Sequence, residues 1–174
     1  MGNFNLETQG DSRTTDFTMN RYKQMMETQW LIAQGMVHDR PIIVRCVSPL
    51  ERQDILPDTP CLVVVYWEYE GDANGLPLSA ENGRMEEFER RLSTALGEDS
   101  FGAMVGVQTV NGRRTFIFYV RDVDGFQEHL VAITDDLENP WPIQIEFDED
   151  PEWNFFFEHI YLEQQEGQGE AGDE

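Results

Sequence analysis

Basic side chains are scarce in this sequence of 174 residues, and lysine is nearly absent. Twelve Lys and Arg residues stand against 34 Asp and Glu residues, which gives a formal net charge of −22. Lys23 is the only lysine, and no base follows Arg121. Nucleic acids and anionic membranes repel so acidic a chain, whereas a basic protein attracts it. We therefore expect no direct binding to nucleic acid or membrane.

Long apolar runs are absent too, since no stretch reaches the length of about 18 residues typical of a membrane helix. The N-terminal sequence MGNFNLETQGDSRTTDF has no basic stretch followed by an apolar one, which is the pattern of a secretory signal. We therefore expect a cytoplasmic protein. Cys46 and Cys61 each lie in an apolar, β-rich stretch, where buried thiols are expected and a disulfide or metal pair is the minor alternative.

Motifs of familiar catalytic chemistry are missing. The sequence contains no G-x-G-x-x-G, G-x-x-x-x-G-K-S/T, G-x-S-x-G or H-E-x-x-H motif. His38, His129 and His159 do not lie at ligand spacing from another histidine or a cysteine. We therefore expect a protein that is not an enzyme, with no catalytic residue, metal or cofactor.

Apolar patterning predicts a folded α+β domain. Hydrophobic residues make up 40% of the chain and aromatic residues 11%, enough for a core. The predicted elements, in order, are a hairpin over 29–47, a strand over 61–70, a helix from about Arg84 with a stop at Gly97, a hairpin turning at Asn111-Gly112, a helix with Asp124 as its N-cap, a strand over 142–147 and a short helix from Pro151.

This order from Cys61 onward is that of the ferredoxin-like split β-α-β sandwich, an antiparallel sheet with both helices on one face. The first hairpin is an addition to it, the short C-terminal helix is expected to close over a sheet edge, and another two-layer α+β sandwich is the alternative. We expect a loose polar arm over residues 1–27, a single domain over 28–163 and a disordered acidic tail over 164–174.

Acidic residues near the C-terminus are the candidates for a partner-binding surface. Seventeen acids and no base follow Arg121. The candidates are Asp135, Asp136, Glu146, Asp148, Glu149, Asp150 and Glu152. Glu146 and Asp148 alternate with apolar residues on the predicted strand, so they share the face opposite to the apolar one. The alternative is a solvated face that only keeps the protein soluble. A calcium loop is excluded because the D-x-D-x-D-G spacing is missing and Pro151 interrupts the run.

Aromatic residues on two predicted strands are a second feature. They are Tyr66, Trp67, Tyr69, Phe116, Phe118 and Tyr119. Such strands stack bases in some RNA-binding domains, but there the aromatics are surrounded by Lys and Arg. Core packing is therefore the favoured interpretation.

Several segments together resemble a known family. GMVHDRPIIVR, CLVVVYWEYE, VNGRRTFIFYVRD and the closing DPEWNFFFEHIYL are similar to the bacterial domain-of-unknown-function 695 family, over about residues 29–162. That family has no established activity, so the resemblance implies no catalytic residue. It implies structural roles for Asp150, Pro151 and Trp153, in which Pro151 starts a turn and Trp153 anchors the turn to the sheet. Some relatives resemble chains fused to a domain like the protein regulator of ribonuclease E.

Charge and missing chemistry favour a non-enzymatic binding protein that neutralises or regulates a basic protein, most concretely as a toxin immunity protein or nuclease inhibitor. A ribonuclease E regulator-like protein and a nucleic-acid mimic are alternatives. A further alternative, from a different class, is an enzyme that uses carboxylates such as Glu68, Glu70, Glu146 or Asp148, with or without a divalent ion. The oligomeric state is left open by the sequence.

Overall fold

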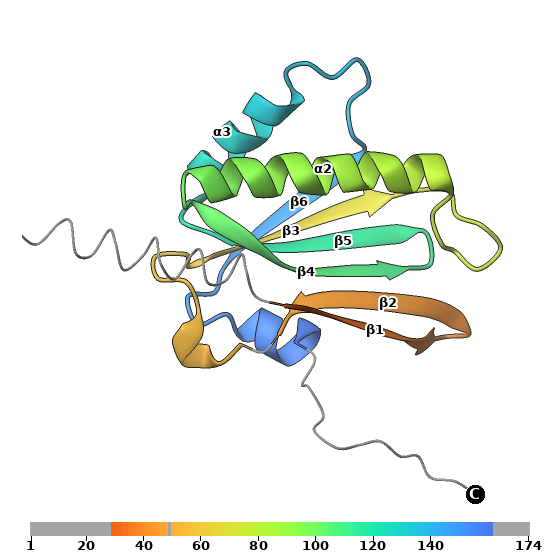
Figure 1. Cartoon of the computed structure of the whole chain (residues 1–174), viewed down its shortest axis with the longest axis horizontal. Coiled ribbons are helices and arrows are strands. Elements are labelled where there is room, and N and C mark those ends of the chain that lie inside the picture. The colour runs from red at the N-terminus through yellow and green to blue at the C-terminus, as the bar shows by residue number, and fades with distance from the viewer. Residues whose placement is uncertain (1–28, 49, 162–174) are drawn as a thin grey trace, which may run out of the picture.

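The protein is an α+β structure built on a six-stranded antiparallel sheet, as Figure 1 shows. The computed structural model describes residues 29–48 and 50–161, so the predicted arm over 1–27 and tail over 164–174 lie outside it. The strands are β1 (Trp30–Val37), β2 (Arg40–Val47), β3 (Cys61–Glu68), β4 (Gly102–Val110), β5 (Arg113–Val120) and β6 (Ile143–Glu149). Their order in the sheet is β1-β2-β4-β5-β3-β6, which places β1 and β6 at the two edges. The α+β class predicted from the sequence is confirmed.

Two hairpins are closed by pairs of residues with positive φ. Asn111 and Gly112 have φ values of 45° and 81°, and His38 and Asp39 have values of 49° and 63°. Both φ signs are those of the type I′ turn, whose twist matches the twist of the flanking strands. The Asn-Gly turn is therefore confirmed.

The helices α2 (Ser79–Glu98) and α3 (Val123–Thr134) cover one face of the sheet (Figure 1). The core beneath them is aromatic, with Trp67, Phe88, Phe116, Phe118 and Phe126 fully buried. Core packing is thus confirmed for the strand aromatics Trp67, Phe116 and Phe118, while Tyr119 is buried on the other face.

The ends of these helices differ from the prediction. α2 begins at Ser79, earlier than the predicted Arg84. The prediction missed its first turns because they are polar and have no apolar periodicity. The helix ends at Glu98, and the residue of positive φ that closes it is Ser100, not the predicted Gly97. Ser100 has a φ of 49°, and the N–H groups of Ser100 and Phe101 donate to the carbonyls of Gly97 and Leu96, as in a Schellman motif. Asp122, not Asp124, caps α3, since its Oδ1 accepts from Gly125 N at 2.7 Å.

The opposite face of the sheet is covered at one end by the C-terminal segment. The short helices here are η1 (Arg52–Asp54) and η2 (Phe156–Ile160), the second a single π-helical turn. Trp153, Phe156 and Ile160 are buried in a second core with residues of β3, β4 and β5. The segment therefore packs against the central strands, which corrects the expectation that it closes over a sheet edge. Gly106 permits this approach, because a Cβ there would lie 2.5 Å from Ile160 Cγ2.

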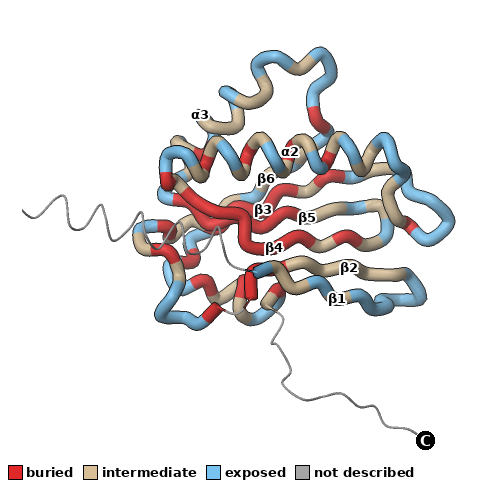
Figure 2. The backbone as a smooth tube through the Cα atoms, in the orientation of Figure 1, coloured by how far each residue is buried: buried red, intermediate tan, exposed pale blue. Residues whose placement is uncertain are grey.

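Burial is concentrated in the central strands, which Figure 2 shows in red, while most of β1 is exposed. Cys46 is buried and Cys61 is half-buried, and no disulfide occurs within the described ranges. No helix in the described part of the chain is long and apolar enough to cross a membrane.

Candidate functional site

Four of the predicted acidic residues lie along or just beyond the edge strand β6. Glu146 and Asp148 are exposed on the face opposite to the helices, because they pair with Val64 and Leu62, which belong to the second core. Glu149 and Glu152 are exposed where the strand ends. We call Glu146, Asp148, Glu149 and Glu152 the acidic edge. The alternation predicted for β6 is confirmed.

Asp150 belongs to the same acidic run but lies inside the protein. It is only 8% exposed, and none of the bases in the described part of the chain forms an ion pair with it. Its Oδ1 accepts from Asn154 N and its Oδ2 from Phe155 N, both at 2.8 Å, and Tyr119 Oη donates to Oδ2 at 2.7 Å. A carboxylate with three donors is satisfied without a counterion. The prediction that Asp150 lies on the acidic surface is therefore corrected: its carboxylate holds the C-terminal segment to the sheet.

Trp153 completes this anchor. Its ring stacks on Tyr119 with centroids 4.3 Å apart, and its Nε1 donates to the Thr59 carbonyl at 3.2 Å. Trp153 has a φ of 58°, which follows from the turn that begins at Pro151 and is closed by Trp153 N donating to Asp150 O. The structural roles implied for these residues agree with this geometry.

Asp135 and Asp136 are exposed but separate from the acidic edge. They follow α3 in the helical layer, whereas Glu146 and Asp148 face the other side of the sheet. Asp136 is paired with Arg91 on α2 at 2.8 Å, and the hydrogen bond from Arg91 lowers its pKa. The seven predicted residues thus form one edge, one buried anchor and one separate helical pair.

The arginines of the described chain are grouped mainly around α2, where carboxylates pair with them. The pairs are Arg45–Glu89, Arg84–Glu81, Arg90–Glu87, Arg91–Glu87, Arg91–Asp136 and, at the end of β5, Arg113–Glu68. Hydrogen bonds from Arg90 and Arg91 lower the pKa of Glu87 to about 2. Arg52 is near the acidic edge but donates to the Glu152 carbonyl, not to its carboxylate. Within residues 29–48 and 50–161, no arginine forms an ion pair with the acidic edge.

The residues considered for catalysis do not come together. Glu68 is paired with Arg113, and Glu146 accepts a hydrogen bond from Tyr66 Oη at 2.9 Å. His129 connects the helices, with Nε2 2.7 Å from Asp99 Oδ2 and Nδ1 2.6 Å from the Gly125 carbonyl. The described residues include no group of three or more His, Cys, Asp or Glu side chains placed to hold a metal ion.

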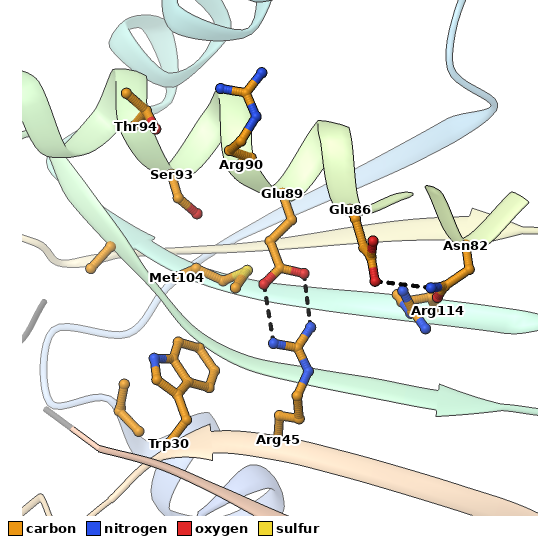
Figure 3. Close-up of a pocket in the computed structure, with 12 residues that line it drawn as sticks. Trp30, Arg45, Asn82, Glu86, Glu89, Arg90, Ser93, Thr94, Met104 and Arg114 are labelled. Atoms are coloured by element: carbon orange, nitrogen blue, oxygen red, sulfur yellow. Dashed lines mark hydrogen bonds and ion pairs between the residues drawn. The ribbon is translucent and has the colours of Figure 1, made fainter. Parts of the chain in front are cut away.

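A cleft that the sequence did not predict lies between α2 and the sheet (Figure 3). Its volume is about 540 Å³, within the range of small-molecule sites. It is lined by Trp30, Arg45, Val47, Asn82, Glu86, Glu89, Arg90, Ser93, Thr94, Ala103, Met104 and Arg114. These residues come from β1, β2, α2, β4 and β5, so no local sequence spacing could have assembled them.

Two arginines of the cleft have different surroundings. Arg45 is held by both oxygens of Glu89, at 3.1 and 2.8 Å, and its guanidinium lies 5.7 Å from the centre of the Trp30 ring. Arg114 Nε donates to Thr109 Oγ1 at 2.9 Å, and no carboxylate of the described chain forms an ion pair with it. Burial, and then the charge of Arg45, lower the pKa of Arg114.

Comparison with known proteins identifies one family. The model described as "Family of unknown function (DUF695)" matches residues 28–161. No curated protein and no solved structure matches the chain.

Proposed function

We propose that this chain, which belongs to DUF695, a family of unknown function, is a non-enzymatic binding protein. In this proposal its acidic edge binds a basic protein. The observation that carries the proposal is how the charges are distributed. The three arginines of α2, and Arg45 beside it, have carboxylate partners within the chain, whereas the acidic edge has no base paired with it among the described residues.

Unpaired carboxylates attract a basic partner in two ways. Their field speeds the encounter, because charges of one sign raise association rates with an oppositely charged surface. Once the partner is bound, its Lys and Arg side chains donate to carboxylates that have no competing base. Glu87 illustrates the contrast, because Arg90 and Arg91 already occupy its oxygens.

The position of β6 favours access by a partner. We propose that β3, α2, β4, β5, α3 and β6 form a ferredoxin-like split β-α-β unit, extended by the β1–β2 hairpin beyond β4. The strand order β6-β3-β5-β4, the antiparallel pairing and the two helices on one face support this assignment. In this order β6 is an edge strand, so a partner reaches its side chains without displacing another strand.

The partner class that fits best is a toxin or nuclease. An enzyme that acts on nucleic acid needs a basic surface to bind phosphates, and a folded acidic protein that occupies this surface inhibits the enzyme. We therefore propose a role as an immunity protein or inhibitor in the cytoplasm.

The test is an affinity capture from the source lysate at low salt, with three versions of the full chain as bait. The first is the wild type. The second neutralises the acidic edge with Glu146→Gln, Asp148→Asn, Glu149→Gln and Glu152→Gln. The third is a control with the same change in charge at exposed acids elsewhere, made with Asp39→Asn, Glu70→Gln, Glu98→Gln and Glu128→Gln.

The proposal predicts a basic protein that elutes late in a salt gradient from the wild type and the control but is lost from the edge variant. Equal loss from both variants would assign the binding to net charge alone. Retention by the edge variant, or no basic protein on any bait, would overturn the proposal.

A further inference from the structure

We propose that the cleft between α2 and the sheet binds a small molecule that carries one carboxylate on a flat apolar body. This site lies on the helical side of the sheet and is independent of the proposed acidic edge. Each part of such a ligand has a matching part of the cleft, which Figure 3 shows from one side.

Arg114 matches the carboxylate. Its Nε is used by Thr109, which fixes the plane of the guanidinium, and its other nitrogens have no ion pair within the described structure. A partly buried guanidinium without a counterion is unfavourable, and a carboxylate that reaches it forms charge-assisted hydrogen bonds. The fork of donors on arginine suits a carboxylate better than the point charge of a lysine would.

The two nearby glutamates are already engaged. Glu89 is bound by Arg45, and Glu86 accepts from Asn82 Nδ2 at 2.9 Å. The negative charges of both raise the pKa of Arg114 and so favour its charged form, but neither glutamate forms an ion pair with it. Three arginines of the lining, Arg45, Arg90 and Arg114, stand against these two glutamates, so the formal charge of the cleft is +1, which favours a monocarboxylate over a phosphate or a polyanion.

The other end of the cleft matches an apolar body. Trp30, Val47, Ala103 and Met104 line it, and Figure 3 shows Trp30 and Met104 on the side of the Arg45–Glu89 pair away from Arg114 and Asn82. A flat ring can stack on the indole of Trp30. Ser93 also lines the cleft, and its Oγ is buried without a hydrogen-bond partner in the described structure, so its hydroxyl can form a hydrogen bond with a polar atom of the ligand.

The test is an NMR titration of the ¹⁵N-labelled full chain with 3-phenylpropionate, compared with its uncharged amide. The reporters are the indole N–H of Trp30, assigned with Trp30→Phe, and the Nε–H of Arg114. We expect saturable shifts of both signals with the acid and affinity for the amide weaker by about tenfold or more.

Two variants locate the binding. Arg114→Gln is expected to weaken the affinity for the acid by about tenfold and to leave the affinity for the amide unchanged. Arg113→Gln is the matched control, because Arg113 is the neighbouring residue on β5 and points to the other face, where it pairs with Glu68. Its affinity for the acid is expected to equal that of the wild type.

Three results would overturn the proposal. They are equal affinity for acid and amide, no saturable shift of the Trp30 signal up to about 20 mM, or unchanged binding by Arg114→Gln. The acid–amide comparison uses only the wild type, so it decides the matter even where a variant fails to fold.

Discussion

The carboxylates of this protein can be compared in two groups, those that are buried or held in ion pairs and those that are exposed without a base. Around α2 and at Asp150, acidic side chains accept from arginines, backbone N–H groups or a tyrosine. Along the acidic edge, no arginine of the described chain pairs with the carboxylates, although they carry the same charge. Composition therefore does not distinguish acids that hold the fold together from acids that are exposed for binding a partner. The position of each acid on the strand or in the turn makes this distinction. Asp148 and Asp150 lie two positions apart, yet Asp148 is exposed and, among the described residues, accepts only from Glu149 N, whereas Asp150 is buried and accepts from three donors.

The largest expected effect separates these two residues. Asp150→Ala should lower the free energy of unfolding by about 3 kcal/mol, because it leaves two backbone N–H groups and the Tyr119 hydroxyl without their acceptor. Asp148→Ala, at an exposed position, should change it by less than about 0.5 kcal/mol. Urea denaturation measures both. Equal effects would mean that Asp150 is not an anchor.

Tyr119 tests the same anchor from the other side and should have a smaller effect. Tyr119→Phe should lower the free energy of unfolding, measured by the same urea denaturation, by about 1–2 kcal/mol, because the Tyr119 hydroxyl donates to Asp150 and accepts from Phe156 N.

The same residue predicts a dependence on alkaline pH. Burial, and then the hydrogen bond to Asp150, raise the pKa of Tyr119 above its ordinary value of 10.0. The folded state therefore holds this proton more tightly than the unfolded state, and the resulting stability, present below pH 10, is lost as pH rises above it. Unfolding followed between pH 8 and 12 should show a steeper alkaline loss for the wild type than for Tyr119→Phe; parallel curves would contradict this.

The ion pair in the cleft should contribute less. Glu89→Gln should lower stability by about 1 kcal/mol, because Arg45 loses a bidentate partner at a site where both side chains are mostly covered. Glu70→Gln, at an exposed acid, is the control and should have no measurable effect in the same thermal or urea experiment. An equally small effect of the two substitutions would place Glu89 among the acids that the fold does not use.

The smallest effect concerns Glu87, whose carboxylate is well solvated. Hydrogen bonds from Arg90 and Arg91 lower its pKa from 4.5 to about 2. The folded state therefore releases this proton more readily, so its contribution is present above pH 4.5 and is lost as pH falls towards 2. Glu87→Gln should make the acid limb of the stability curve shallower in this window, and an unchanged limb would show that the two arginines do not hold Glu87 in solution.

Local patterns predicted much of the fold. The Asn-Gly turn, the alternation of β6 and the apolar faces of both helices depend on neighbouring residues, and each is found in the structure. The ends of the helices were harder to predict from the sequence. The polar first turns of α2 have no periodicity, and Ser100 adopts a positive φ that is unusual for a residue other than glycine.

The sites were only partly predictable. The exposed acids of β6 follow from alternation, but the turn after Asp150 directs that carboxylate inward, and only tertiary contacts with Tyr119 reveal it. The cleft depends on five elements distant in sequence. The one local signal was the pair Arg113-Arg114, because adjacent residues on a strand face opposite sides and one of them had to point towards the helices.

The most direct test of the central claim is zero-length carbodiimide cross-linking of the wild-type chain to the basic protein it retains, read by mass spectrometry. The reagent joins carboxylates to lysines, and Lys23 is the only lysine here, so cross-links within the chain are few. We predict that cross-links to the partner's lysines concentrate at Glu146, Asp148, Glu149 and Glu152. Cross-links spread evenly over the acids, or centred on exposed positions such as Glu70 and Glu98, would contradict binding through the acidic edge.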